Sequence, residues 1–231
     1  RCDGGYSEYL LANPWNLMKI PDQIELKDAC FLEPTAVIVH ATKITNALNL
    51  NNKNILIIGA GFLGLLLSEL LYKNTTNRVS VFDVNEFKFS RLPDNITTFT
   101  SERLLTKDSY DLVFECTGSE SGFNTSLNAV NRNGNICIIG NPVRPISVSQ
   151  NNYSKILRKE VSIKGSWNSS YKKAGNDDWI FAREALLEGL SPSKYVSHEI
   201  KLDELGNFLF KCWNHKNKNK IFKHVKGVVK L

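Results

Sequence analysis

Apolar residues in this chain form short continuous runs that alternate with longer segments of helical periodicity. The run at residues 54–58 is apolar and rich in β-branched side chains, which is typical of a strand buried on both faces. An apolar segment of helical length follows as far as Asn74, and a second short run spans residues 79–83. Because parallel strands need a long crossover connection, this order predicts a strand–helix–strand unit with parallel pairing.

The same alternation continues as far as residue 167. Further strands are predicted over residues 96–100, 111–116, 136–139 and 161–167, and helical segments over 85–92, 119–131 and 156–159. Six strands joined by short helical crossovers indicate an α/β protein with a doubly wound parallel Rossmann sheet.

Residues at both ends of the chain depart from this alternation and are expected to form parts of a second, flanking unit. Strands are predicted over 6–12, 17–20, 196–202 and 222–231, and helices over 25–32, 36–48, 177–190 and 203–213. We therefore predict a dinucleotide-binding domain over residues 35–192, with residues 1–34 and 193–231 belonging to the flanking unit.

The turn after the first buried strand carries three glycines at G-x-G-x-x-G spacing, Gly59-Ala-Gly61-Phe62-Leu63-Gly64. Gly59 permits a tight turn, Gly61 lets the backbone approach a pyrophosphate, and Gly64 lets helix and strand pack closely. The helix that begins inside the motif offers free N–H groups and a positive dipole end to phosphates.

An acidic residue ends the second strand and strengthens this interpretation. Asp83 lies 24 residues after Gly59, where a carboxylate accepts hydrogen bonds from the ribose hydroxyls of NAD and repels the 2′-phosphate of NADP. Thr117-Gly118 and Gly140-Asn141 follow two later strands, and ligands of such sheets lie at the carboxyl ends of strands. Methyltransferases also carry an acid at this place, but the complete glycine spacing favours NAD.

Composition excludes several classes of protein. No run of about 18 apolar residues occurs, so no membrane span is expected. The net charge of +6 comes from lysines beyond Glu204, and no interleaved aromatic residues suggest a nucleic-acid groove. Five scattered cysteines favour a reducing compartment, and hence the cytoplasm, over a disulfide framework.

Several segments together resemble the zinc-type medium-chain alcohol and polyol dehydrogenases. They are Asp-Gly-Gly-Tyr-Ser-Glu-Tyr over residues 3–9, Lys-Ile-Pro-Asp over 19–22, Phe-Leu-Glu-Pro over 31–34, and the glycine motif at the spacing that this family shows. Lys-Ile-Leu-Arg-Lys-Glu over 155–160 and Ile-Lys-Gly-Ser-Trp over 163–167 are similar to the sugar-alcohol-phosphate branch of the family.

The resemblance implies a Rossmann domain beside a β-rich, GroES-like catalytic domain. It implies that Lys88 joins Asp83 and the glycine loop in holding the adenosine half of NAD, although Lys88 could equally be solvated. Thr117, Gly118 and Gly140 would lie along the nicotinamide. Glu33 would match a glutamate that coordinates the catalytic zinc or sits behind it, whereas the residues alone suggest a carboxylate that caps a helix.

The resemblance also implies an NAD-dependent enzyme that interconverts a secondary alcohol of a polyol, or of a sugar-alcohol phosphate, with the ketone by zinc-assisted hydride transfer. The family's other zinc ligands have no counterpart here, so we expect a truncated chain that binds NAD but is incomplete for catalysis. Alternatives are a non-catalytic NAD(H)-binding or sensing module and a zinc-free medium-chain reductase. The expected partners are a small polyol or polyol phosphate and further copies of the chain, as a homodimer or homotetramer.

Overall fold

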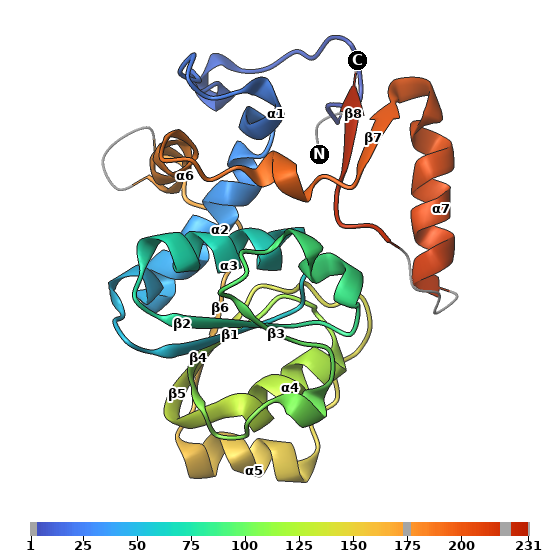
Figure 1. Cartoon of the computed structure of the whole chain (residues 1–231). Helices are drawn as coiled ribbons and strands as arrows, with labels where there is room; N and C mark the ends of the chain where they lie inside the picture. Colours follow the sequence, from blue (N-terminus) through green and yellow to red (C-terminus); the bar gives the residue numbers. More distant parts are fainter. Residues whose placement is uncertain (1–3, 173–176, 218–222, 231) are drawn as a thin grey trace.

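The computed structural model describes residues 4–172, 177–217 and 223–230, and its centre is a six-stranded parallel sheet with the order β3-β2-β1-β4-β5-β6 (Figure 1). The first strand, β1, lies in the middle of the sheet. β2 and β3 extend the sheet on one side of it, and β4, β5 and β6 extend it on the other. The strands are β1 (Asn54–Ile58), β2 (Arg78–Phe82), β3 (Thr97–Phe99), β4 (Tyr110–Glu115), β5 (Val130–Ile138) and β6 (Ser162–Gly165). The predicted doubly wound α/β class is confirmed.

Helices cover both faces of the sheet and explain why its central strands are apolar on both sides. α2 (Leu32–Thr45), α3 (Phe62–Asn74) and α6 (Asp178–Leu187) lie over one face, and α4 (Glu120–Ala129) and α5 (Gln150–Lys159) over the other (Figure 1). Along β1, Ile55 and Ile57 belong to the first of two cores, and Leu56 and Ile58 to the second. All four are fully or almost fully buried.

The last part of the chain folds back beside the sheet. β7 (His198–Lys201) and β8 (Gly227–Lys230) form a parallel pair, with α7 (Leu205–Asn217) next to them (Figure 1). α1 (Leu26–Ala29) precedes α2. Short 3-10 helices span Pro14–Asn16, Ala47–Asn49, Glu86–Arg91, Glu102–Leu104, Pro192–Tyr195 and Leu202–Glu204.

Two predictions for the first fifty residues are wrong in detail. The segments 6–12 and 17–20 form no strand, and Tyr9 and Leu11 are almost completely exposed, because no described strand lies beside them. α2 begins at Leu32 and not at the predicted residue 36, so Pro34 is its third residue. The first-turn N–H groups of a helix have no intrahelical partner, so proline is tolerated there as well.

A buried carboxylate ties α2, α6 and the segment after β6 together. Asp178 is 2% exposed; its Oδ2 lies 2.8 Å from His40 Nδ1 and accepts a bond from Ser170 N–H at 2.6 Å. Its Oδ1 lies 2.9 Å from Lys43 Nζ. Burial alone would raise the pKa of Asp178, but the Ser170 N–H, Lys43 and His40 together lower it. His40 therefore helps to join α2 to α6.

A second buried acid anchors α3 to the connection that precedes β7. Glu69 is 2% exposed and accepts a hydrogen bond from Tyr195 Oη at 2.9 Å. The ammonium groups of Lys194 and Lys73 lie 2.8 and 3.3 Å from its oxygens. Across the described residues, no helix is long and apolar enough to span a membrane.

Candidate dinucleotide-binding site

The glycine loop between β1 and α3 leaves room for a ligand at one glycine only. A Cβ on Gly59 would lie 2.7 Å from Thr117 Cγ2, and its φ of +101° disfavours other residues. A Cβ on Gly64 would lie 1.9 Å from the Gly59 carbonyl oxygen, so any larger residue at this position would prevent α3 from packing against the loop. Gly61 is the N-cap of α3, and a Cβ on it would meet nothing within 4 Å. The open space at the helix N-terminus fits a pyrophosphate.

Asp83 stands at the carboxyl end of β2, and its carboxylate is firmly held. It is 8% exposed; Oδ2 accepts the Ala60 N–H at 2.8 Å, and Oδ1 accepts the Asn85 N–H at 2.9 Å. Lys88 Nζ donates to Oδ2 at 2.6 Å. The sequence left open whether Lys88 is solvated, and the structure places it beside Asp83. The bond to Ala60 fixes the carboxylate against the glycine loop itself.

A pocket of about 500 Å³ opens on one side of this loop, a volume within the usual range for ligand sites. Four of the predicted residues line it: Gly59, Asp83, Lys88 and Thr117. The remaining lining is rich in hydroxyl groups from the ends of β3 and β4, including Thr100, Ser101, Ser119 and Ser121. This lining offers hydrogen bonds to a nucleoside without adding a net positive charge.

A second pocket, of about 420 Å³, lies on the other side of the glycine loop and contains five more of the predicted site residues. These are Glu33, Gly61, Phe62, Leu63 and Gly64; Cys116, Ile139 and Trp167 are among those that complete it. Ser166 also lines it, and its buried hydroxyl has no hydrogen-bond partner among the described residues. An unsatisfied buried hydroxyl is costly, so this pocket suits a ligand that offers a polar atom.

The turn after β4 is built on a carboxylate that sequence reasoning missed. Glu115, 2% exposed, accepts hydrogen bonds from the N–H groups of Thr117 and Gly118 and from the Thr117 hydroxyl. Gly118 has a φ of +61°, and a Cβ on Gly140 would lie 2.0 Å from its nitrogen. Gly118 and Gly140 are not among the described residues lining either pocket; they pack backbone to backbone behind them.

Other lining residues also lay outside the prediction. Ser166, Trp167 and Asn168 follow β6 directly, so the rule that ligands lie at strand ends could have found them. Lys226 comes from the segment before β8, and its Nζ lies 5.2 Å from the centre of the Phe62 ring. No sequence motif marks this lysine, because the fold alone brings the end of the chain to the glycine loop.

The described residues do not fit a zinc ion at this place. Glu33 lies exposed in the first turn of α2. Across the described part of the chain, no group of three or more His, Cys, Asp or Glu residues could hold a metal. A catalytic zinc needs three protein ligands and an open position. No step of a reaction is therefore assigned to zinc on these residues.

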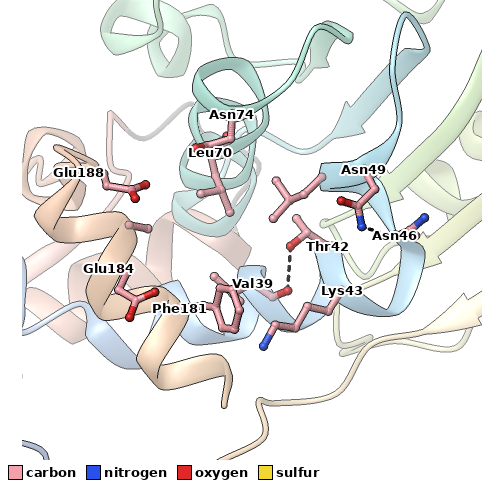
Figure 2. A pocket seen from close by; sticks show the side chains of 12 residues that line it. Val39, Thr42, Lys43, Asn46, Asn49, Leu70, Asn74, Phe181, Glu184 and Glu188 are labelled. Atoms are coloured by element: carbon pink, nitrogen blue, oxygen red, sulfur yellow. Dashed lines mark hydrogen bonds between the residues drawn. The ribbon is translucent and has the colours of Figure 1, made fainter. Parts of the chain in front are cut away.

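A third hollow, of about 520 Å³, lies far from the strand ends, between α2, α3 and α6 (Figure 2). Its apolar floor includes Val39 and Leu70, and Glu184 and Glu188 line it from α6. Lys43 Nζ stacks 3.9 Å from the centre of the Phe181 ring. None of the predicted site residues lines this hollow, so the candidate site consists of the two pockets at the glycine loop.

Residues 78–182, from β2 into α6, match the family of zinc-binding dehydrogenases. Over these residues the chain is similar to the zinc-type medium-chain dehydrogenases. Among curated members it is 25% identical over 210 residues to galactitol 1-phosphate 5-dehydrogenase of Escherichia coli K12, covering 86% of this chain and 60% of that enzyme. L-threonine 3-dehydrogenase of Shewanella woodyi is 26% identical over 214 residues, covering 87% and 60%. The chain thus spans about 60% of the length of these relatives.

Solved structures share the fold. The crystal structure of galactitol-1-phosphate dehydrogenase from Escherichia coli superimposes with a TM-score of 0.80 at 22% identity, covering 95% of this chain and 65% of that one. An alcohol dehydrogenase from E. coli CFT073, crystallised in complex with NADH, gives a TM-score of 0.78 at 21% identity, covering 99% and 66%. The predicted fold and the predicted resemblance to zinc-type medium-chain dehydrogenases are confirmed.

Proposed function

We propose that this chain binds NAD(H) and provides the dinucleotide-binding part of an alcohol or polyol dehydrogenase. The observation that supports this most directly is the juxtaposition of Asp83 with the glycine loop, where the carboxylate accepts the N–H of Ala60. The helix N-terminus with open space at Gly61 would hold the pyrophosphate, and Asp83 with Lys88 would orient the adenosine ribose.

A preference for NAD over NADP follows from the charge at the end of β2. The Asp83 carboxylate is buried and negatively charged. Lys88 is already paired with it, so the lysine is not positioned to neutralise a 2′-phosphate. A phosphate at the 2′ position would bring its negative charge against this carboxylate. The hydroxyl-rich pocket beside it suits an uncharged adenosine.

When bound, the nicotinamide supplies a hydride acceptor for the oxidation of a secondary alcohol to a ketone. The residues of this chain would bind and orient it. The pocket lined by Cys116, Ile139 and Trp167 would exclude water, and the Ser166 hydroxyl would donate to or accept from a polar atom of the ligand. Thr117, Gly118 and Gly140 would shape the turns on the nicotinamide side. Glu33 would contribute to a zinc centre only if the other ligands come from residues outside this chain.

The substrate class rests on the relatives, one of which is named for a sugar-alcohol phosphate. The Lys-Ile-Leu-Arg-Lys segment gives a phosphorylated substrate no support, because it lies on α5. There Lys159 donates to the carbonyl oxygens of Leu127 and Val130, and Lys155 donates to Asn128. Lys226, in the second pocket, is the cation that we assign to an anionic ligand. We propose a polyol or polyol phosphate as substrate.

Self-association is proposed on the exposed edge of the sheet. β6 ends the strand order, and all four of its residues are exposed. Such an edge offers unpaired backbone groups to a second copy. We therefore propose a homodimer or homotetramer, checked by light scattering. The odd number of cysteines supports the cytoplasm as the proposed compartment.

The test of NAD binding is a titration with NADH and with NADPH, followed by nicotinamide fluorescence. NADH is expected to bind more tightly than NADPH. Asp83→Ala should weaken the binding of NADH by about tenfold or more, because a hydrogen bond to a charged group contributes about 1.5–3 kcal/mol. Asp94→Ala removes an equal charge from an exposed position and serves as the control. Equal affinity of the wild type and Asp83→Ala for NADH would exclude the assigned site.

Two alternatives are separated from the dehydrogenase by activity. A non-catalytic NAD(H) module would bind NADH, yet the full-length protein would oxidise no polyol with NAD⁺ and zinc. A zinc-free reductase would stay active after chelation of zinc. A dehydrogenase of the proposed kind would oxidise free or phosphorylated polyols and would lose this activity on chelation.

A further inference from the structure

Two histidines face each other where β7 begins and the chain returns toward β8, close to Lys226, which lines the second glycine-loop pocket. His198 is the first residue of β7, and His224 lies three residues before β8. Their Nδ1 atoms are 3.4 Å apart, and their ring centres are 5.3 Å apart. Ser197 Oγ lies 2.9 Å from His198 Nδ1 and 3.4 Å from His224 Nδ1.

The separation of the two ring nitrogens suits a shared metal ion. Imidazole nitrogens bind zinc at about 2.0–2.1 Å, and two of them at a tetrahedral angle are about 3.3–3.4 Å apart. A hydrogen bond between nitrogen and its acceptor is usually shorter, at about 2.9–3.0 Å. Two ring nitrogens that approach to 3.4 Å therefore have the spacing of neighbouring ligands in one coordination sphere.

The surroundings hold both rings in place before any ion binds. Ser197 Oγ accepts the N–H groups of Val225 at 2.9 Å and Lys226 at 3.2 Å, which fixes the two segments against each other. The Phe208 ring of α7 packs on both imidazoles, with centre distances of 5.2 and 5.4 Å. Pre-positioned ligands lose little conformational entropy on binding.

The ligand type determines which metals suit the site. Imidazole nitrogen favours zinc, copper and nickel over calcium or magnesium. The nearby Lys226 opposes any cation. The site is therefore expected to be weaker than a structural zinc site with four protein ligands.

We propose that His198 and His224 form a two-histidine site for a divalent transition metal, completed by water. Because the described residues offer no third His, Cys, Asp or Glu at this place, the ion should exchange readily. A bound ion would join the start of β7 to the segment that carries Lys226, and would stabilise the folded state by mass action. Neither histidine is among the described residues that line the two glycine-loop pockets.

The test uses Zn²⁺ alone, added to the ¹⁵N-labelled chain in a buffer without phosphate, with the histidine ring nitrogens followed by NMR. We expect Zn²⁺ to shift the Nδ1 resonances of His198 and His224, and Mg²⁺ at the same concentration to leave them unchanged. In the wild type this readout needs no substitution, so a failure to fold cannot confuse it. Unchanged Nδ1 resonances of both histidines would refute the site.

Variants extend the test to affinity. His198→Gln and His224→Gln should each weaken the binding of Zn²⁺ by about tenfold or more, because each substitution removes one of the two proposed protein ligands. The control is His215→Gln, which removes a histidine of α7 that is not part of the proposed site. This variant should bind Zn²⁺ as the wild type does. The variants keep all five cysteines, so binding to thiols is common to all of them. Equal Zn²⁺ affinity in all four proteins would overturn the proposal.

Discussion

Replacing Asp178 by asparagine tests one of the buried carboxylates that join elements of the fold. The carboxylate is 2% exposed and faces two partners, His40 and Lys43, whose side chains are 27% and 28% exposed. The amide oxygen of the new side chain could still accept the Ser170 N–H, but Lys43 would be left without a counter-charge and His40 without its carboxylate partner. Since hydrogen bonds to charged groups contribute about 1.5–3 kcal/mol and the partners keep some solvent, we expect a loss of about 2–3 kcal/mol.

The dependence on pH gives this prediction its specificity. The folded-state pKa of Asp178 is lowered, so its contribution is present above the unfolded pKa of about 3.9 and is lost as pH falls through the folded value. The difference in stability between the wild type and Asp178→Asn should therefore be full at about pH 7 and should shrink as the pH falls below about 3.9. Urea unfolding at about pH 7 and at a series of pH values below about 3.9 measures the difference.

The expected loss corresponds to a fall in the melting temperature of about 5–10 °C for a chain of this size. Asp94→Asn, at an exposed position, is the control and should change stability by less than about 0.5 kcal/mol. A difference below about 0.5 kcal/mol at neutral pH, or one that persists unchanged in acid, would refute the electrostatic role assigned to Asp178.

Three further predictions concern the glycine loop, a buried hydroxyl and the thiols. Gly64→Ala should destabilise the fold by about 1–3 kcal/mol or more because its Cβ meets backbone at 1.9 Å, whereas Gly61→Ala should unfold almost as the wild type does and lose NADH affinity. Denaturant unfolding and NADH titration of both variants separate the two roles, and equal effects would contradict them. Ser166→Ala should leave the unliganded protein as stable as the wild type, or up to about 1 kcal/mol more stable, because it removes an unsatisfied buried hydroxyl. Weaker NADH binding by this variant is expected, and unchanged binding would place the hydroxyl outside the ligand site. Burial raises the pKa of Cys137 to about 12, so iodoacetamide at about pH 8 should modify exposed Cys30 first and Cys137 only on unfolding, as followed by mass spectrometry.

The central sheet was predictable because its strands are buried on both faces and therefore read as continuous apolar runs. β1 and β4 appear in the sequence almost with their observed bounds. The segment 6–12 shows comparable apolar residues, but a strand needs a neighbour for its backbone groups, and Leu11 is fully exposed instead. Local pattern thus predicts a strand only where the fold supplies a partner.

The site was predictable where backbone geometry dictates residue type, and unpredictable where distant segments meet. Gly59, Gly64 and Asp83 follow from the turn, the helix packing and the strand end. Lys226 lies far along the chain from the glycine loop, and only the tertiary fold brings it there. Lys159, in contrast, lies in a segment that resembles the sugar-alcohol-phosphate branch, yet its ammonium donates to the carbonyl oxygens of Leu127 and Val130.

The strand order also has a consequence for how the protein is made. β1 pairs with β2 through Ile55 and Val79, 24 residues apart, but with β4 through Ile55 and Leu112, 57 residues apart. Closing the longer loop costs more entropy, and synthesis delivers β4 later. On the ribosome, the β1–β2–β3 half is therefore expected to assemble first with one flank of β1 still bare. The cleft beside Thr117 forms only when β4 has emerged, so a ligand of this cleft can influence folding only from that moment.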